Sequence, residues 1–183
     1  MTFTEKYNLV RNQARADGLK LGLFWVVSFA LFIGNFFHSI CGILWIATMV
    51  ATPFLVGIFT RCYAERLLEG VISYRHAFAH GFLTVFYASL ILAIAQWAYF
   101  AFLDNGFVLG RYIGMISDQD FLKSMESMGY TKKSIEEFTT MLRSLRPIDI
   151  ALQMMWSNVL AGGIISITTA LYASSRGHFR PRQ

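Results

Sequence analysis

The sequence predicts an all-α integral membrane protein that has four transmembrane helices and a small helical hairpin inserted between the third and the fourth. Four long apolar stretches carry this prediction, at residues 19–37, 40–60, 77–103 and 150–173. Apart from Lys20 at the edge of the first stretch, they contain no Asp, Glu, Lys or Arg. A hydrocarbon core about 30 Å thick is crossed by roughly 20 helical residues, so every stretch is long enough to span it.

The composition supports the same class. Hydrophobic residues make up 55% of the 183 residues and the mean hydropathy is +0.47, both higher than is usual for a soluble domain. A surface helix of a soluble protein keeps one polar face for water, and these stretches offer no such face. We therefore expect residues 1–183 to form a single membrane domain, with residues 104–149 as its only substantial polar insertion.

Basic residues lie at alternate ends of the predicted helices. They precede the first stretch, separate the second from the third and follow the fourth: Lys6, Arg11, Arg15 and Lys20; Arg61, Arg66 and Arg75; and Arg176, Arg180 and Arg182. By the positive-inside rule, this pattern predicts a multi-pass bacterial inner-membrane protein with both termini in the cytoplasm and residues 104–149 in the periplasm. Topology thus explains the net charge of +5, which also favours anionic lipids and gives no indication of nucleic-acid binding.

Local signals predict the ends of the first three helices. Gly34 and Asn35 both tolerate the left-handed conformation, so we expect them to end the first helix and open a tight hairpin into the second. Charges spaced four residues apart as far as Glu69 predict that the second helix continues beyond the membrane to Gly70. Ser73 then fits the N-cap of the third helix.

Pro53 lies inside the second stretch. A proline has no N–H to donate to the carbonyl of Met49, so we expect the helix to kink there. The hydroxyls of Thr48 and Thr52 are close enough along the chain to compensate this freed carbonyl.

The insertion between the third and fourth helices has the signals of two short amphipathic helices. Asp118 is placed to cap the first, which Gly129 ends, and Thr131 is placed to cap the second. Along the second helix, apolar residues recur every three or four positions and form one stripe: Ile135, Phe138, Leu142 and Leu145. This stripe is the predicted surface for a partner.

Two pairs of residues have spacings found in metal sites. Asp118 and Asp120 have the Asp-x-Asp form that can hold a divalent metal and a nucleotide-sugar diphosphate, and His76 and His80 lie one helical turn apart. The sequence supplies no converging third ligand for either pair, and helix capping and an interfacial histidine pair explain them. We therefore predict no metal, cofactor or catalytic residue and no enzymatic activity.

Uncharged residues are the candidate contacts inside the predicted helices. Gln153 and Asn158 are polar groups that need partners in lipid, and interhelical hydrogen bonding is their expected role. Gly162 and Gly163 favour close helix packing, within the bundle or between protomers. A transporter usually shows a buried carboxylate, lysine or arginine, and we expect no buried charge here.

The segment from Gly70 to Phe82 reads Gly-Val-Ile-Ser-Tyr-Arg-His-Ala-Phe-Ala-His-Gly-Phe. It is similar to the Ile-Ser-Phe-x-x-Ala-Phe-x-x-Gly stretch that opens the third helix in a family of small Bacteroidetes membrane proteins, domain of unknown function 4199. Residues 128–131 followed by Ile135, and the glycine-rich fourth stretch, resemble that family too. The resemblance covers nearly the whole chain. It implies four spanning helices, a bacterial inner-membrane location, no established activity, and gene neighbourhoods that contain a polyprenyl-phosphate glycosyltransferase.

Three functions are compatible with these features. The leading hypothesis is a non-enzymatic membrane subunit that binds lipid, another membrane protein or a second copy of itself through its helix faces and hairpin. The alternative is a small transporter or permeation subunit, with Pro53 as a hinge and Asn158 and Gln153 as polar contacts. A third hypothesis, an accessory role in lipid-linked sugar transfer, depends on Asp118, Asp120 and the gene neighbourhood that the resemblance implies.

Overall fold

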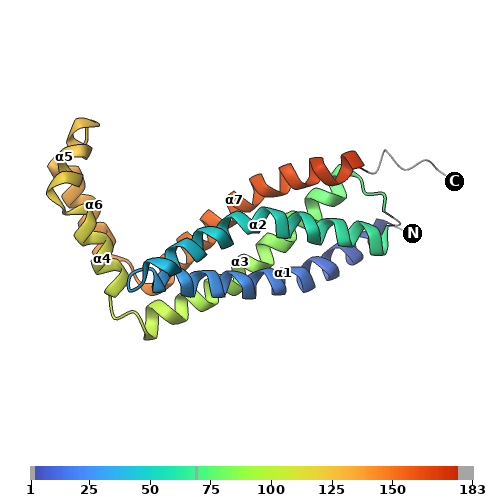
Figure 1. The fold of residues 1–183 in the computed structure, drawn as a ribbon, viewed down its shortest axis with the longest axis horizontal. Coiled ribbons are helices and arrows are strands. Elements are labelled where there is room, and N and C mark those ends of the chain that lie inside the picture. The colour runs from blue at the N-terminus through green and yellow to red at the C-terminus, as the bar shows by residue number, and fades with distance from the viewer. Residues whose placement is uncertain (1–2, 69, 177–183) are drawn as a thin grey trace. The chain divides into compact units, whose positions relative to one another are not determined.

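The computed structural model describes residues 3–68 and 70–176, with side chains for residues 7–68 and 70–174. Over these residues the chain forms seven α-helices and no strand (Figure 1). They are α1 (Phe3–Gly34), α2 (Ser39–Leu67), α3 (Tyr74–Phe102), α4 (Phe107–Ile116), α5 (Gln119–Ser127), α6 (Lys132–Ser144) and α7 (Pro147–Arg176). Glu69, Arg180 and Arg182, which the sequence analysis used, lie outside the described residues, as do the side chains of Lys6 and Arg176.

Four of the seven helices are long and apolar enough to cross a membrane. The candidate spans are Tyr7–Gly34 in α1, Ser39–Leu67 in α2, Tyr74–Phe102 in α3 and Pro147–Ser174 in α7. The predicted all-helical class with four membrane helices is therefore confirmed. A helix of 29 residues, such as α2 or α3, is about 43 Å long and exceeds a hydrocarbon core of about 30 Å.

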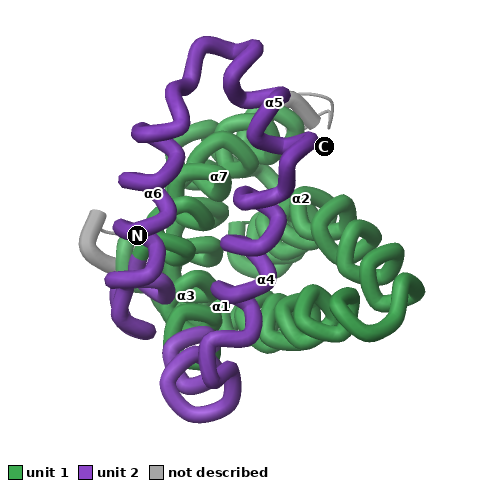
Figure 2. Tube along the Cα trace, turned by 90° about the vertical axis from the view of Figure 1, so that its left-hand side faces the viewer, with its two compact units in different colours: residues 1–95, 153–183 green, residues 96–152 purple. Residues whose placement is uncertain are grey.

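The chain divides into two compact units (Figure 2). Residues 1–95 and 153–183 form the first, here called the membrane unit, in which α1, α2, most of α3 and most of α7 lie side by side. Residues 96–152 form the second, here called the insertion unit, which contains α4, α5 and α6.

The first helix begins far earlier than the apolar stretch predicts. Its N-terminal part is polar on one side only, because Val10 and Ala14 point inward and are 2% and 0% exposed. Val10 belongs to an apolar cluster that joins the ends of several helices: Val10, Tyr63, Ala64, Ile72, Ala77 and Ala170. A second cluster fills the unit further along α1, α2 and α3: Leu21, Trp25, Val56, Val85, Ala88 and Leu92. The polar start of α1 is thus a packed part of the bundle.

The ends of the first two helices have different causes. As predicted, α1 ends at Gly34, but neither Gly34 nor Asn35 adopts the left-handed conformation. Instead, the side chain of Asn35 occupies the space that a Cβ on Gly42 would need, at the start of α2. Gly70 does end α2 in the left-handed conformation, with φ of 83° and its N–H donating to the carbonyl of Ala64 at 2.9 Å.

Pro53 is accommodated inside α2, which continues on both sides of it. The neighbouring hydroxyls bond other carbonyls than that of Met49, because Thr52 donates to the carbonyl of Thr48 and Thr48 to that of Trp45. The expected compensation of the freed carbonyl by these two threonines is therefore wrong.

Glycines allow α1 and α7 to approach α3 closely. A Cβ on Gly18 would lie 2.6 Å from the Cβ of Tyr87, and one on Gly22 would lie 2.9 Å from that of Ile91. On α7, a Cβ on Gly162 would overlap the side chain of Val85. The neighbouring Gly163 has more room, because its Cβ would find Phe82 only at 4.0 Å.

The insertion unit contains three helices, whereas the sequence analysis predicted two. The predicted caps are confirmed: Asp118 accepts from the N–H of Asp120 at the start of α5, and Thr131 from that of Ser134 at the start of α6. The additional helix is α4, whose first turn is held by the bond from the N–H of Val108 to Asp104. It packs against α6 and α5 and buries Val108 and Ile113.

The two adjacent glycines of α7 give a matched test of this packing. Gly162→Ala should destabilise the membrane unit by about 1–3 kcal/mol, because the new methyl group forces Val85 and α3 away. Gly163→Ala should change stability by less than about 0.5 kcal/mol, because its methyl group meets only Phe82 at van der Waals distance. Both values are measurable as free energies of unfolding in detergent micelles. Equal effects of the two variants would contradict the close approach of α3 to Gly162.

Candidate functional site

A carboxylate lies buried among three helices of the membrane unit. Asp17, on α1, is only 2% exposed. Its carboxylate accepts hydrogen bonds from Gln13 Nε2 at 3.0 Å and from Lys20 Nζ at 3.1 Å. On the side facing α3, Asp17 Oδ2 lies 3.4 Å from His80 Nε2. Helical spacing explains the local arrangement, since residues three and four apart share one face of α1.

His80 is the residue that joins this carboxylate to the other helices. Its side chain is fully buried, and its imidazole stacks on the ring of Tyr63 with centroids 4.5 Å apart and planes 5° from parallel. The second ring nitrogen, Nδ1, lies 3.3 Å from Thr60 Oγ1 on α2. We call the set of Gln13, Asp17, Lys20, Thr60, Tyr63 and His80 the polar cluster.

The expectation of no buried charge is therefore wrong. Asp17 precedes the first apolar stretch, and the rule that charges lie outside the membrane placed it in the cytoplasm. The long α1 carries it instead onto the face that packs against α2 and α3. Sequence reasoning noted His80 only as half of an interfacial pair, and the signal it missed was the inward-facing period of Val10, Ala14 and Asp17, spaced four and three residues apart.

The predicted alternatives for the two histidines do not form. His76 Nδ1 is bonded to Ser73 Oγ at 2.7 Å, whereas His80 faces Thr60 and Asp17, so the two rings do not converge. Within residues 3–68 and 70–176, no group of three or more His, Cys, Asp or Glu side chains is placed to hold a metal ion. The order Thr60–His80–Asp17 resembles a nucleophile, base and acid, but the hydroxyl of Thr60 is 0% exposed and inaccessible to a substrate.

Two further polar contacts join α1 to α2 inside the apolar spans. Trp25 Nε1 donates to Thr52 Oγ1 at 3.1 Å, and the hydroxyls of Ser28 and Thr48 lie 2.6 Å apart. Because Ser28 and Thr52 are buried, these groups satisfy one another in the absence of water.

The residues predicted on α7 lie apart from the polar cluster. Gln153 is exposed and Asn158 is half-buried. Gly162 is buried at the approach to Val85, and Gly163 and Pro53 are half-buried.

In the insertion unit, the predicted stripe is only partly covered. Ile135 is 7% exposed, Leu142 and Leu145 are half-buried, and Phe138 is 47% exposed. Asp120, half of the predicted metal motif, lies 3.6 Å from Lys123, while Asp118 caps α5.

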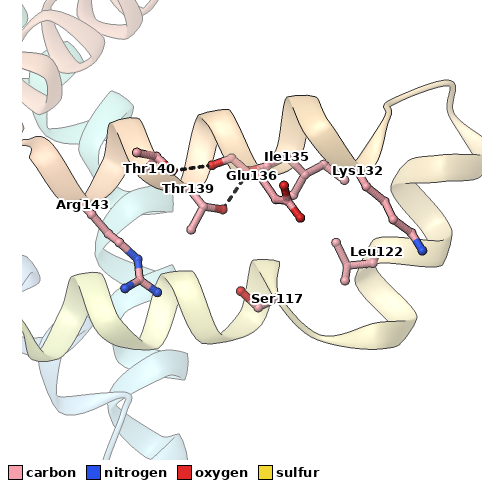
Figure 3. A pocket seen from close by; sticks show the side chains of 8 residues that line it. All are labelled: Ser117, Leu122, Lys132, Ile135, Glu136, Thr139, Thr140 and Arg143. Atoms are coloured by element: carbon pink, nitrogen blue, oxygen red, sulfur yellow. Dashed lines mark hydrogen bonds between the residues drawn. The ribbon is translucent and has the colours of Figure 1, made fainter.

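A cleft of about 600 Å³ lies between α6 and the segment at the end of α4 and start of α5 (Figure 3). Its lining is Ser117, Leu122, Lys132, Ile135, Glu136, Thr139, Thr140 and Arg143. Figure 3 shows Arg143 reaching from α6 toward α4, and Lys132 at the opposite end of the cleft. Thr139 and Thr140 donate to carbonyls of their own helix, so their hydroxyl protons are already bonded.

Comparison with known proteins gives one match. A family model described as "Protein of unknown function (DUF4199)" matches residues 16–174. No curated protein and no solved structure matches the chain.

Removing the carboxylate should strongly destabilise the membrane unit. Asp17→Leu leaves Lys20 and His80 without their shared partner, and breaking one side of a buried ion pair costs about 3–5 kcal/mol. Glu65→Gln is the matched control, because it removes one charge from the exposed pair with Arg61 and should cost less than about 1 kcal/mol. The measurement is the free energy of unfolding of each variant in the same detergent. If Asp17→Leu proved no worse than Glu65→Gln, the buried contact would not hold the helices together.

Proposed function

The chain belongs to the DUF4199 family of proteins of unknown function, and we propose that it acts as a non-enzymatic subunit of a bacterial inner membrane. On this proposal it binds another membrane protein or lipid through its helix faces and its insertion unit. The observation that carries the proposal is the uneven burial of the four spans. Half of the apolar window of α3 is buried within the protein, against 17% for α2 and 22% for α7.

The uncovered side chains form continuous stripes. On α2 they recur every three or four residues: Ile43, Ile46, Val50, Phe54 and Ile58. On α7 the corresponding stripe is Leu160, Ile164, Ile167 and Leu171, each between 44% and 70% exposed. Such faces suit lipid tails or the helices of a partner.

The inner surfaces support a structural role for the polar groups. The pairs Trp25–Thr52 and Ser28–Thr48 use their hydrogen bonds on each other and join α1 to α2. In the insertion unit, Phe138 and Met141 are 47% and 53% exposed, which offers a second apolar surface to a partner.

A transporter or permeation subunit is the second candidate, and one specific observation favours it. Asp17 and His80 are buried ionisable residues within candidate spans, and such residues commonly mark ion and substrate pathways. The present geometry favours it less, because Gln13, Lys20 and His80 already surround the carboxylate.

We propose that both termini lie in the cytoplasm and residues 104–149 in the periplasm, because the basic residues lie at the corresponding helix ends. In a background without Cys41 and Cys62, a cysteine at Ser124 should react with a membrane-impermeant thiol reagent added to spheroplasts. A cysteine at Ser174 should react only after the membrane is permeabilised. Labelling of both positions from the same side would refute this topology.

Phe138→Asp should abolish co-purification of a membrane partner while leaving the fold intact. The side chain is half-exposed, so its replacement removes a contact surface without opening the interior. The measurement is affinity purification of the full chain in mild detergent, followed by mass spectrometry. Thr140→Asp is the matched control, because it adds the same charge to an exposed position on the opposite face of α6.

Two outcomes of these purifications would contradict the subunit proposal. The wild-type protein could yield neither a stoichiometric membrane protein nor bound lipid. Alternatively, Asp17→Asn could abolish a solute flux while the folded protein keeps all its partners, which would establish the transport alternative. On the subunit proposal Asn158→Leu is tolerated in either assay, because one interhelical hydrogen bond contributes only about 0.6 kcal/mol.

A further inference from the structure

We propose that His80 is a proton-binding site of the membrane unit. Asp17 and Thr60 hold its imidazole so that it takes up a second proton from water inside the helix bundle. The proposal is independent of which partner the protein binds, and it begins with the orientation of the ring.

The surroundings of Asp17 determine which nitrogen carries the proton in neutral His80. Gln13 and Lys20 both donate to Asp17, as befits a charged carboxylate, which only accepts. His80 Nε2, the nitrogen that faces this carboxylate at 3.4 Å, must therefore carry a hydrogen. A bare Nε2 would place two acceptors against each other in a buried site.

The opposite nitrogen is matched to either protonation state. Nδ1 lies 3.3 Å from the hydroxyl of Thr60, which can both donate and accept. Neutral His80 accepts a hydrogen bond from Thr60, and doubly protonated His80 donates one to it. The contact is thus retained when the proton arrives, with only the hydroxyl hydrogen turning away.

Two other features favour the cationic ring. The imidazole is stacked on Tyr63 at 4.5 Å, so it faces the negative surface of an aromatic ring. The carboxylate of Asp17 is its nearest opposite charge. Both groups stabilise an imidazolium more than a neutral imidazole.

The other charged and titratable groups around the ring are few. Lys20 opposes protonation, but its side chain is 62% exposed and is therefore partly screened by water. On α2, the groups facing the ring are Thr60 and Tyr63. On α7, residues 153–174 include no Asp, Glu, Lys, Arg or His, and the titratable Tyr172 is 53% exposed.

A proton can reach the cluster from the edge of the membrane. Thr60 lies about two helical turns, roughly 10 Å, before the end of α2, and His80 a similar distance after the start of α3. Lys20 extends from the cluster to the surface. Protonation adds a charge attracted to Asp17, so the contact of α3 with α1 responds to pH in the range where imidazole titrates.

The test uses the full-length protein, labelled with ¹⁵N-histidine, in lipid nanodiscs, with His80→Gln to assign the signal. The ¹⁵N shifts should report a neutral ring protonated on Nε2 at about pH 8 and a doubly protonated ring near pH 5. His38 and His76 serve as internal references. A neutral ring protonated on Nδ1, or a ring whose protonation does not change over this range, would overturn the proposal.

Two variants with opposite expected effects sharpen the test. At one pH within the transition, Asp17→Asn should lower the ratio of charged to neutral His80 by about tenfold, because the anion is lost. Lys20→Gln should raise the same ratio, because the opposing cation is lost. If Asp17→Asn does not fold, Lys20→Gln alone decides, and an unchanged ratio in it would contradict the proposed electrostatic environment.

Discussion

Within a bilayer, every polar group that a helix carries into the hydrocarbon has to find its partner in the protein, and this constraint arranges the membrane unit. Water offers no substitute there, so an unpaired group costs free energy. Asp17 presents the strongest form of the demand, because it is charged and 2% exposed. Its three partners come from α1 and α3, and His80 extends the contact to Thr60 on α2.

The same constraint fixes the register of the bundle. Ser28–Thr48 and Trp25–Thr52 lie in sequence along the antiparallel helices α1 and α2, and Asp17 is placed one further step toward the level of Thr60. A slip of one residue would separate all of these groups at once. Apolar packing alone is less selective, since a methyl group finds contacts in many registers. The apolar clusters supply contact area, and the polar pairs select which arrangement of the helices is adopted.

Sequence reasoning predicted the parts of the fold that depend on length and hydropathy, and missed those that depend on tertiary contacts. The spans of α2 and α3 follow from their apolar stretches, and the caps Asp118 and Thr131 follow from local chemistry. Asp17 was missed because a hydropathy pattern shows where charge is rare, but not where a helix continues and packs. Nor could sequence distinguish Gly162 from Gly163, since the difference lies in the position of Val85 on another helix.

Stability alone does not account for a charge at position 17. Replacing a buried ion pair by apolar residues of similar size is often neutral or stabilising, because the desolvation of two polar groups is avoided. Leucines in place of Asp17 and His80 would remove that cost and still fill the space. What apolar residues cannot supply is a directional contact that rejects other registers, or a ring that changes charge near neutral pH. In this geometry the two roles share one set of atoms, because the contact that aligns α1 with α3 is also the one that gains a charge when His80 is protonated.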